Sequence, residues 1–284
     1  MLKKNVETFL GCDKEYKDAE TVLFGAPFDS TTSYRPGTRF GSSAVRHESF
    51  GIETYSPYQN LDLEEDSLVF DAGDLEFAIG DTNSVLNCIE DCASQILSNN
   101  KRPFMIGGEH LVTLGAFRAA LKKYPDIHII HFDAHADLRL DYLGVELSHA
   151  CVLRRCFELT GENRIFQFGI RSGDKEEFTW AKTHVKMQPF NFDNLEETLN
   201  KLKNKPVYFT VDLDVLDPSV FPGTGTPEPG GVSFDELRKA VTTVCSQANV
   251  VACDVNELSP HYDISGASTM VACKIIREML LALK

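Results

Sequence analysis

Residues 127–137 read IHIIHFDAHAD, an apolar run that passes directly into a cluster of acidic and imidazole side chains. A second stretch of the same kind, residues 206–214, reads PVYFTVDLD. Near-continuous apolar strands are typical of parallel sheets that are covered by helices on both faces. The two stretches therefore predict an α/β fold in which polar clusters follow buried strands.

Short β-rich runs alternate with helical periods along the rest of the chain, as expected for such a fold. We predict strands at residues 21–25, 68–71, 103–106, 127–132, 164–168, 185–188, 207–211 and 250–254. We predict helices at residues 82–98, 111–124, 149–159, 195–203, 234–245 and 268–283. Eight parallel strands fit both a TIM barrel and an open three-layer sheet, and periodicity alone does not separate the two.

The spacing of these elements indicates a single domain over residues 1–284, because no internal repeat or linker interrupts it. Two segments, residues 27–46 and 217–231, are expected to be long irregular loops, which are often functional in compact domains. In the second loop, Asp217 follows Asp214 in the pattern D-x-D-x-x-D-P and is expected to orient the loop.

The composition excludes several classes of protein. The 28 Lys and Arg residues against 42 Asp and Glu residues give a net charge of −14, so we expect no nucleic-acid or anionic-lipid partner. No apolar run is long enough for a membrane helix, and the amino-terminal residues carry no secretion signal. A cytoplasmic location is therefore expected. The eight cysteines form no C-x-x-C and are interpreted as small buried side chains.

Polar side chains follow four of the predicted strands. Asp133, His135 and Asp137 are spaced i, i+2, i+4, which in extended geometry points all three to one side. Asp212 and Asp214 repeat this spacing after the second apolar run. The strand at residues 103–106 ends in Gly-Gly-Glu-His, whose glycines permit close backbone approach, and the strand at 250–254 leads into Asp-Val-Asn-Glu.

Parallel strands deliver their carboxyl ends to one edge of the sheet, where α/β proteins bind ligands. More groups meet there than one cation requires, which favours a two-metal site. Carboxylates with imidazole and without thiolate favour Mn²⁺, with Mg²⁺, Fe²⁺ and Co²⁺ as alternatives, whereas zinc more usually shows cysteine. We interpret His128 and His131 as packing and hydrogen-bonding residues. The six expected ligands are His110, Asp133, His135, Asp137, Asp212 and Asp214.

The motifs GGEH, HFDAHADLR, SHACVLRR, FTVDLDVLDP, PGTGTPEPGG and DVNELSP occur in this order and together resemble the ureohydrolase (arginase/agmatinase) family. The resemblance runs from about residue 21 to the carboxyl terminus. It implies a three-layer αβα fold with an eight-stranded parallel sheet. It also implies two Mn²⁺ ions per chain, release of urea from a small cationic guanidino substrate, and a homo-oligomer, either a trimer or a hexamer.

The resemblance also implies roles for individual residues. Asp133 and Asp212 would bridge the two ions, and Asp137 would pass a proton to the leaving amine. Glu257 would hold the guanidinium, and His149 would relay protons, as an ordinary near-neutral pKa permits. One ion would be held by His110, Asp133, Asp137 and Asp212, and the other by Asp133, His135, Asp212 and Asp214.

The stretch after Asp137 points to agmatine within the family, with putrescine and urea as products in polyamine biosynthesis. It contains no asparagine and carries Asp141 and Glu146, which would disfavour a substrate carboxylate, although Arg139 could bind one. The alternatives are an arginase or another guanidino-substrate hydrolase such as guanidinobutyrase. A histone-deacetylase-like amidohydrolase with one zinc lacks this set of motifs. In a catalytically silent relative we would expect ligands to be missing, but all six are present.

Overall fold

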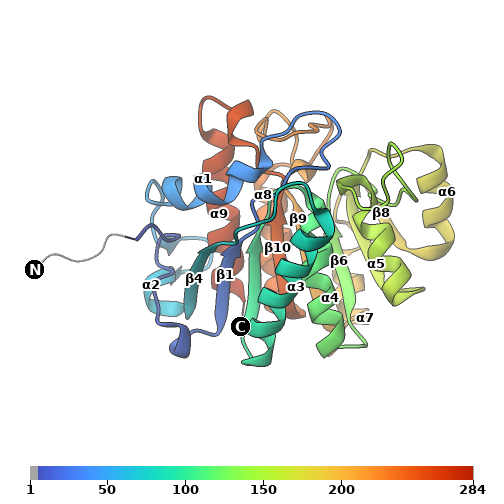
Figure 1. Ribbon diagram of the computed structural model, residues 1–284. Coiled ribbons are helices and arrows are strands. Elements are labelled where there is room, and N and C mark those ends of the chain that lie inside the picture. The colour runs from blue at the N-terminus through green and yellow to red at the C-terminus, as the bar shows by residue number, and fades with distance from the viewer. Residues whose placement is uncertain (1–5, 284) are drawn as a thin grey trace, which may run out of the picture.

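The computed structural model describes residues 6–283, so residues 1–5 and 284 of the expected domain lie outside it. Its centre is an eight-stranded sheet in which every neighbouring pair is parallel (Figure 1). The order across the sheet is β4-β1-β5-β10-β9-β6-β7-β8. The strands are β1 (Thr21–Gly25), β4 (Val69–Asp74), β5 (Arg102–Ile106), β6 (His128–Phe132), β7 (Ile165–Ile170), β8 (Lys186–Pro189), β9 (Pro206–Asp212) and β10 (Asn249–Asn256).

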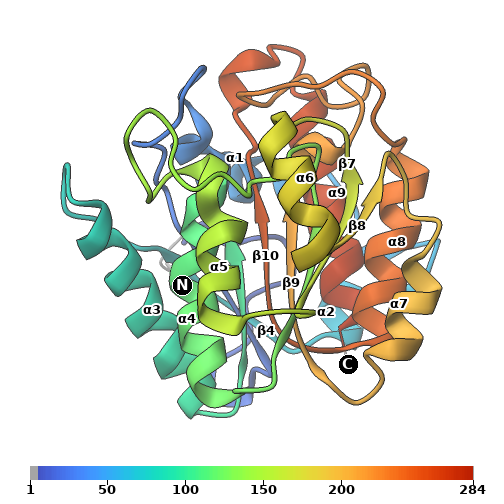
Figure 2. The same cartoon turned by 90° about the vertical axis from the view of Figure 1, so that its right-hand side faces the viewer.

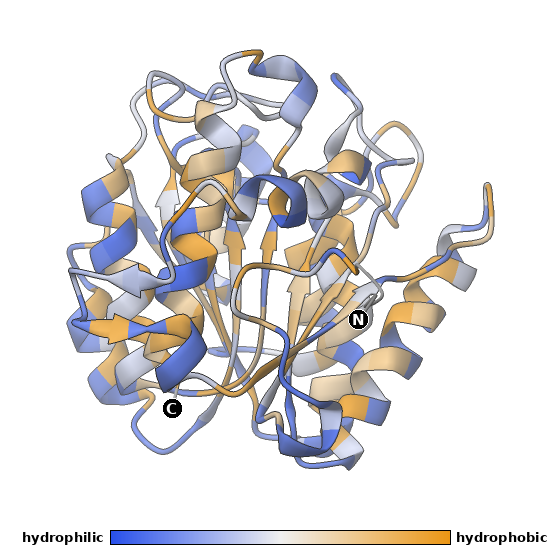
Figure 3. Cartoon of the chain, turned by 90° about the vertical axis from the view of Figure 1, so that its left-hand side faces the viewer, coloured by the Kyte–Doolittle hydropathy of each residue, from blue (hydrophilic) through white to orange (hydrophobic). Residues whose placement is uncertain are grey.

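Helices cover both faces of this sheet and make three layers (Figure 2). One face packs against α1 (Gly41–Ser49), α7 (Leu195–Lys201), α8 (Phe234–Gln247) and α9 (Ala267–Ala282). The other face packs against α3 (Thr82–Ser98), α4 (Thr113–Lys123), α5 (Val152–Thr160) and α6 (Lys175–His184). The strands are mostly apolar between these layers (Figure 3), because a strand that is buried on both faces keeps no polar side.

Smaller elements complete the chain. A two-stranded hairpin, β2 (Tyr55–Ser56) and β3 (Leu61–Asp62), leads into the short helix α2 (Leu63–Asp66). The 3₁₀ helices are η1 (Tyr16–Asp18), η2 (Thr38–Phe40), η3 (His110–Val112), η4 (His149–Cys151), η5 (Leu213–Val215) and η6 (Pro260–Tyr262). No helix within residues 6–283 is long and apolar enough to cross a membrane. All eight cysteines are unpaired, and all but Cys88 and Cys92 are buried.

The eight predicted strands are confirmed, with small shifts at their ends. The sheet has two edges, β4 and β8, so it is open, and this excludes the TIM barrel that the periodicity left possible. The predicted helix at residues 82–98 is confirmed with the same bounds, and the other five predicted helices are confirmed with shifted ends.

Two expectations about irregular segments are wrong. The loop expected over residues 27–46 contains η2 and then α1, whose buried face is built from small and polar side chains around Arg46 and not from an apolar stripe. Helix α6 was not expected, because only Phe178, Trp180 and Ala181 are apolar in its ten residues. A capping box between Asp174 and Glu177 is the sequence signal that would have located its start.

The last strand of the chain lies in the middle of the sheet. Strand β10 pairs with β5 on one side and with β9 on the other, and β9 in turn pairs with β6. Four neighbouring strands, β5, β10, β9 and β6, therefore end side by side. The loops that follow the strands gather at the top of the molecule in Figure 1, as expected for the ligand-binding edge of an α/β sheet.

Candidate active site

The expected ligands lie together at the carboxyl ends of these central strands. His110 begins η3 just after β5, and Asp133 directly follows β6. Asp212 is the last residue of β9, and Asp214 lies in η5. All four of these side chains are at most 3% exposed. The sheet order therefore collects, in one buried place, residues that are up to 104 positions apart in sequence.

A first group of side chains surrounds one imidazole nitrogen. His110 Nδ1 lies 3.0 Å from Asp133 Oδ2, 3.1 Å from Asp137 Oδ2 and 3.4 Å from Asp212 Oδ2. None of these contacts has hydrogen-bond geometry, and the nitrogen has no other hydrogen-bond partner in residues 6–283. A buried nitrogen without a hydrogen-bond partner among the described residues and three carboxylate oxygens around it form a set of donors suited to a cation.

A second group shares Asp133 with the first. His135 Nδ1 lies 3.0 Å from Asp214 Oδ2 and 3.5 Å from Asp133 Oδ1, and these three residues form a set that could hold a metal ion. Backbone N–H groups also hold the carboxylates in place, because His135 N donates to Asp133 Oδ1 and Asp214 N donates to Asp212 Oδ1. The two groups are therefore adjacent and joined through the two oxygens of Asp133.

The pKa shifts of the two His/Asp groups indicate that their buried carboxylates require a compensating positive charge. Burial, with Asp133 and Asp214 nearby, raises the pKa of Asp212 well above its usual range, and burial beside Asp133 raises the pKa of Asp137 to about 7. Burial alone would lower the pKa of His110, but Asp133 and Asp137 outweigh it and raise that pKa well above its usual value. The ion pairs of these aspartates are all with histidines in the described part of the chain. The residues present thus fit divalent cations, which would compensate the buried carboxylates.

The extended geometry expected for residues 133–137 is wrong beyond the first of them. Strand β6 ends at Phe132, and Asp137 has a φ of +54°, in the left-handed region. This turn of the backbone brings the Asp137 carboxylate back towards His110. Glu257 also has a positive φ, +66°. Non-glycine residues in this conformation are uncommon and often occur at functional sites.

The two glycines before Glu109 are required by close packing, as the sequence predicted. A Cβ at Gly108 would lie 2.0 Å from the Phe28 carbonyl oxygen, and one at Gly107 would lie 1.8 Å from Asn256 Oδ1. Neither distance is sterically possible without displacement of the neighbour. The glycines therefore let β5 lead into η3 in contact with the loop that follows β1.

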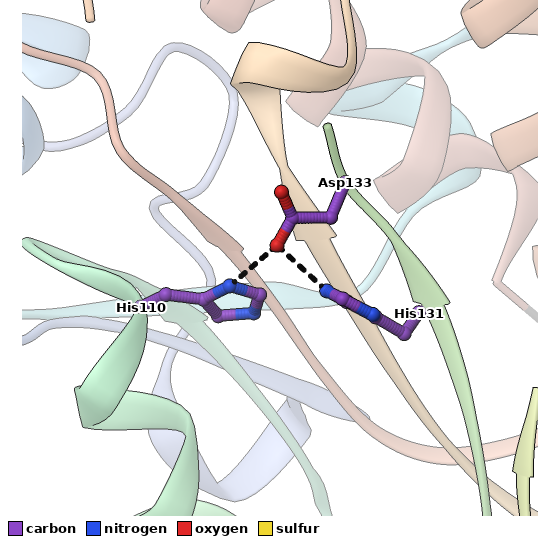
Figure 4. Close-up of side chains that lie close together, drawn as sticks. All are labelled: His110, His131 and Asp133. Atoms are coloured by element: carbon purple, nitrogen blue, oxygen red, sulfur yellow. Dashed lines mark hydrogen bonds and ion pairs between the residues drawn. The ribbon is translucent and has the colours of Figure 1, made fainter. Parts of the chain in front are cut away.

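His131 makes hydrogen bonds, as predicted, but in a more specific way than expected. Its Nε2 lies 2.8 Å from Asp133 Oδ2, and its Nδ1 lies 3.0 Å from Gln167 Nε2 (the first contact is shown in Figure 4). Gln167 Nε2 also donates to the Ala136 carbonyl, which can only accept, so the amide must donate to His131 Nδ1. The proton of a neutral His131 is then on Nε2. It is donated to Asp133, on the opposite side from His110 in Figure 4.

Glu257 lies beside the first group. Its Oε1 accepts a hydrogen bond of 2.7 Å from the backbone N–H of His110, and its side chain is buried. Burial, with Asp214 and Glu109 nearby, raises the pKa of Glu257 well above its usual range. Asp254, on β10, does not join the cluster, because its carboxylate bonds to Tyr208 and Asn256.

A pocket of about 220 Å³ opens next to the second group. His149 lies in its wall at the start of η4. Burial, with His135 and His110 nearby, lowers the pKa of His149 to about 4. The pocket is lined by Ser33, His135, Ala136, Asp137, Arg139, Tyr142, His149, Ala150, Ser172, Gly173, Glu177 and Thr226.

The acidic residues expected to repel a substrate carboxylate do not line this pocket. Asp141 accepts a hydrogen bond from Gly144 N, and Glu146 is 73% exposed and pairs with Arg155. Arg139 does line the pocket, but its guanidinium is held by Asp174 at 3.0 Å and Glu177 at 3.4 Å. The expectation about Asp141 and Glu146 is therefore wrong, because Asp141 is bonded within the turn at residues 141–144 and Glu146 pairs with Arg155 at the surface.

The loop at residues 217–231 is fastened by Asp217, as the sequence predicted. One oxygen of this carboxylate accepts from the backbone N–H and hydroxyl of Ser219, and the other accepts from the N–H groups of Gly230 and Gly231. These hydrogen bonds lower the pKa of Asp217 to about 2. The closed loop places Thr226 in the pocket wall, where its hydroxyl lies 3.4 Å from Asp214 Oδ2.

Known proteins resemble this chain in sequence and in fold. The sequence model of the arginase family matches residues 19–282. The agmatinase of Bacillus subtilis (strain 168) is 47% identical over 97% of this chain and 96% of its own. A protein of known structure from Clostridium difficile is 52% identical, with a TM-score of 0.91 over 95% of this chain and 98% of its own. The agmatine ureohydrolase of Thermoplasma volcanium is 34% identical, with a TM-score of 0.88 over 98% of this chain and 94% of its own.

These matches extend over every strand of the central sheet and over both groups of histidines and aspartates. Likeness over such a length, at such identity, reflects common descent and not a shared local motif. The chain belongs to the arginase family.

Proposed function

We propose that this protein is an agmatinase, which hydrolyses the guanidino group of agmatine to give putrescine and urea. The observation that carries the proposal is the pair of adjacent His/Asp groups that share Asp133 and open on the pocket lined by Asp137 and His149. The similarity to agmatinases along nearly the whole chain supports agmatine as the substrate.

We assign the cofactor as two Mn²⁺ ions per chain. Oxygen and imidazole donors without thiolate favour this ion, and a pair of ions supplies Lewis acidity and a hydroxide-like nucleophile at neutral pH. His110, Asp133, Asp137 and Asp212 would hold one ion, and Asp133, His135, Asp212 and Asp214 the other. The sharing of Asp133 between the two groups is the contact that supports two adjacent ions.

Three side chains of the protein would act on the substrate. One oxygen of Glu257 accepts a hydrogen bond from the His110 backbone N–H, and this bond fixes the carboxylate. The fixed carboxylate would hold the planar guanidinium of the substrate through charge-assisted hydrogen bonds. Asp137 lies in the pocket wall, where its carboxylate can accept a proton and pass it to the leaving amine. His149 lies in the pocket wall, where its imidazole would accept and return protons.

The pocket supports a substrate without a carboxylate, although for a reason that differs from the sequence argument. Arg139 is the cationic side chain in the pocket wall, and Asp174 and Glu177 already pair with it. A substrate carboxylate would have to compete with two carboxylates for one guanidinium, which is costly in a partly buried place. Together, Arg139, Asp174 and Glu177 carry a net negative charge, which favours binding of the ammonium end of agmatine.

The test is a urea-release assay on manganese-loaded protein with agmatine, arginine and guanidinobutyrate at equal concentrations. We expect the highest kcat/KM for agmatine. The variant Arg139→Ala is the matched control for the specificity argument, and it should not create arginine hydrolysis. Preferred hydrolysis of arginine by the wild type, lost in Arg139→Ala, would show that the protein is an arginase. A higher kcat/KM for guanidinobutyrate would show that the protein is a guanidinobutyrase.

We further propose a cytoplasmic homo-oligomer that acts in polyamine biosynthesis. The family implies a trimer or a hexamer, and light scattering on the purified protein distinguishes these from a monomer.

A further inference from the structure

Glu109 is a buried carboxylate that the proposed chemistry does not use. It lies between the glycine pair and His110, and its side chain is fully buried. Its Oε2 accepts from the backbone N–H of Thr31 at 2.8 Å, and its Oε1 accepts from the Thr31 hydroxyl. The Thr32 hydroxyl lies 3.3 Å from Oε2, and the Glu109 backbone N–H donates to the Phe28 carbonyl at 2.8 Å. Both oxygens of the carboxylate are therefore bound to one loop, the segment that follows β1.

The same loop holds His149 at two points. The backbone N–H of His149 donates to Thr31 Oγ1 at 3.1 Å, so Thr31 caps the start of η4 from a distance of 118 residues in sequence. Farther along the loop, the backbone N–H of Ser33 donates to His149 Nε2 at 3.2 Å, and Ser33 Oγ lies 3.0 Å from the same nitrogen. Ser33 and His149 are both in the wall of the active-site pocket.

The chemistry of the groups fixes the direction of these hydrogen bonds. A backbone N–H can only donate, so Thr31 Oγ1 accepts from His149, and when Glu109 is ionised the Thr31 hydroxyl gives its own hydrogen to that carboxylate. Likewise Ser33 N–H donates to His149 Nε2, which therefore carries no proton in the neutral ring. The proton of the neutral imidazole is then on Nδ1, and Nε2 is the acceptor nitrogen.

We propose that Glu109 is a positioning residue for His149, acting through Thr31 and Ser33. By fixing Thr31 and Thr32, it holds the adjacent Ser33 against His149 Nε2 and so sets the orientation and the tautomer of the imidazole in the pocket wall. This inference rests on the proposed function only in so far as His149 is taken to move protons. The positioning itself can be measured without substrate.

The decisive variant is Thr31→Val, which keeps the shape of the side chain and removes the hydroxyl that joins Glu109 to His149. Thr31→Ser restores the hydroxyl and is the conservative rescue. Thr32→Val is the control in the same loop, because the Thr32 hydroxyl donates mainly to the Asp29 carbonyl at 2.6 Å and no hydrogen bond joins it to His149 among the described residues. Glu109→Asp, which withdraws the carboxylate by one methylene, serves if Thr31→Val does not fold.

Two measurements report on positioning. In the urea assay with agmatine, we expect Thr31→Val to lower kcat on the order of tenfold or more with KM within about twofold, because a proton-transfer group is misplaced while substrate contacts stay. We expect Thr31→Ser and Thr32→Val to stay within about threefold of the wild type. The second measurement is the rate at which diethyl pyrocarbonate modifies His149, read by peptide mass spectrometry against the exposed His47 as internal reference. It should rise several-fold in Thr31→Val, because Ser33 no longer occupies Nε2.

The outcomes separate this inference from the proposed function. An unchanged rate of His149 modification in Thr31→Val overturns the inference. An equal loss of kcat in Thr31→Val and Thr32→Val also overturns it, because it would indicate a general loosening of the loop. Faster modification in Thr31→Val, reversed in Thr31→Ser, supports the inference even if the wild type releases no urea from agmatine. The absence of urea release by the wild type would refute the proposed function and leave this inference standing.

Discussion

Replacement of His131 by phenylalanine tests whether this residue orients Asp133. The ring of phenylalanine fills nearly the same volume, so the change removes the hydrogen bond from Nε2 to Asp133 Oδ2 without opening a large cavity. Gln167 keeps its hydrogen bond to the Ala136 carbonyl. Asp133, the residue common to both metal-binding groups, would then keep the hydrogen bond to Oδ1 from the His135 N–H but lose the one that fixes Oδ2.

The expected size of the effect follows from the burial of the pair. His131 and Asp133 are both 0% exposed, so water cannot replace the lost hydrogen bond. A hydrogen bond to a charged group contributes about 1.5–3 kcal/mol. At about 1.4 kcal/mol per factor of ten, this corresponds to a loss of about 10–150-fold in affinity. Replacing other residues that orient a metal ligand costs about 10–100-fold, which agrees with this range.

The assay is a competition titration of Mn²⁺ between the protein and a chelating dye at fixed pH. The control is His128→Phe, because His128 lies three residues earlier in the same strand, on its opposite face and away from Asp133. We expect both Mn²⁺ sites to weaken in His131→Phe and neither to weaken in His128→Phe. Thermal denaturation of both variants establishes that each one is folded.

Two results would contradict this reasoning. Wild-type affinity in His131→Phe would mean that backbone contacts such as the His135 N–H are sufficient to hold Asp133. A loss of more than about a thousandfold, well beyond the range for an orienting residue, would mean that His131 is itself a ligand.

Three further predictions concern other parts of the site. Asp133→Ala removes the residue shared by both groups, so elemental analysis should find fewer than two Mn²⁺ per chain and turnover should be nearly abolished. His149→Asn should keep its metal and lose about a hundredfold or more in kcat, and a parallel fall in metal content would assign His149 as a ligand. The Ser219 hydroxyl and N–H, with the Gly230 and Gly231 N–H groups, hold the pKa of Asp217 near 2, so its folded pKa is lower than its unfolded pKa. Its stabilisation is therefore complete above about pH 4 and is lost as the pH falls towards 2, and denaturation curves of Asp217→Asn should lack this loss.

The sheet could be predicted because its strands carry strong local signals. The runs IHIIHF and PVYFTV are apolar on both faces, and a strand of this kind is recognisable without knowledge of its partners. The order of the strands was not available from such patterns, since register and neighbours depend on contacts distant in sequence. For the same reason the periodicity left the barrel open, and only the resemblance to a family favoured the open sheet.

The two helices α1 and α6, which the sequence did not predict, show the limits of apolar periodicity as a signal for helices. Helix α1 buries Ser42, Ser49 and the charged Arg46, whose guanidinium pairs with Asp71 at 2.8 Å. A helix that is held by a buried ion pair in place of an apolar stripe carries no periodic signal. Helix α6 has few apolar residues, and its capping box was the signal available.

The metal-binding residues of the candidate site could be predicted because they follow recognisable strands. Each of the six expected ligands lies at or just after the carboxyl end of a strand, and the structure brings all six together. The surrounding contacts were not predictable, because they join distant segments. Glu109 meets Thr31 across 78 residues, and no local pattern marks such a pair. The misreading of Asp141 has a local cause, because its carboxylate bonds to Gly144 N three residues along the chain and not to the pocket.

The central place of β10 has a consequence for how the protein is made. In the sheet, β4, β1 and β5 form one part, and β9, β6, β7 and β8 form another, and β10 alone pairs with both. His110 follows the first part, while Asp133, His135 and Asp212 follow the second. A nascent chain therefore cannot join the two parts by strand pairing until residues 249–256 have been synthesised.

Formation of the first His/Asp group thus coincides with the last pairing step of folding. Cation binding by this first group therefore requires the completed sheet, so manganese should speed or trap the final step of refolding. Before that step, β5 and β9 are open edges that can pair with other chains. Aggregation during synthesis should accordingly be most severe for fragments that end between residues 212 and 249, which carry both open edges and lack the strand that joins them.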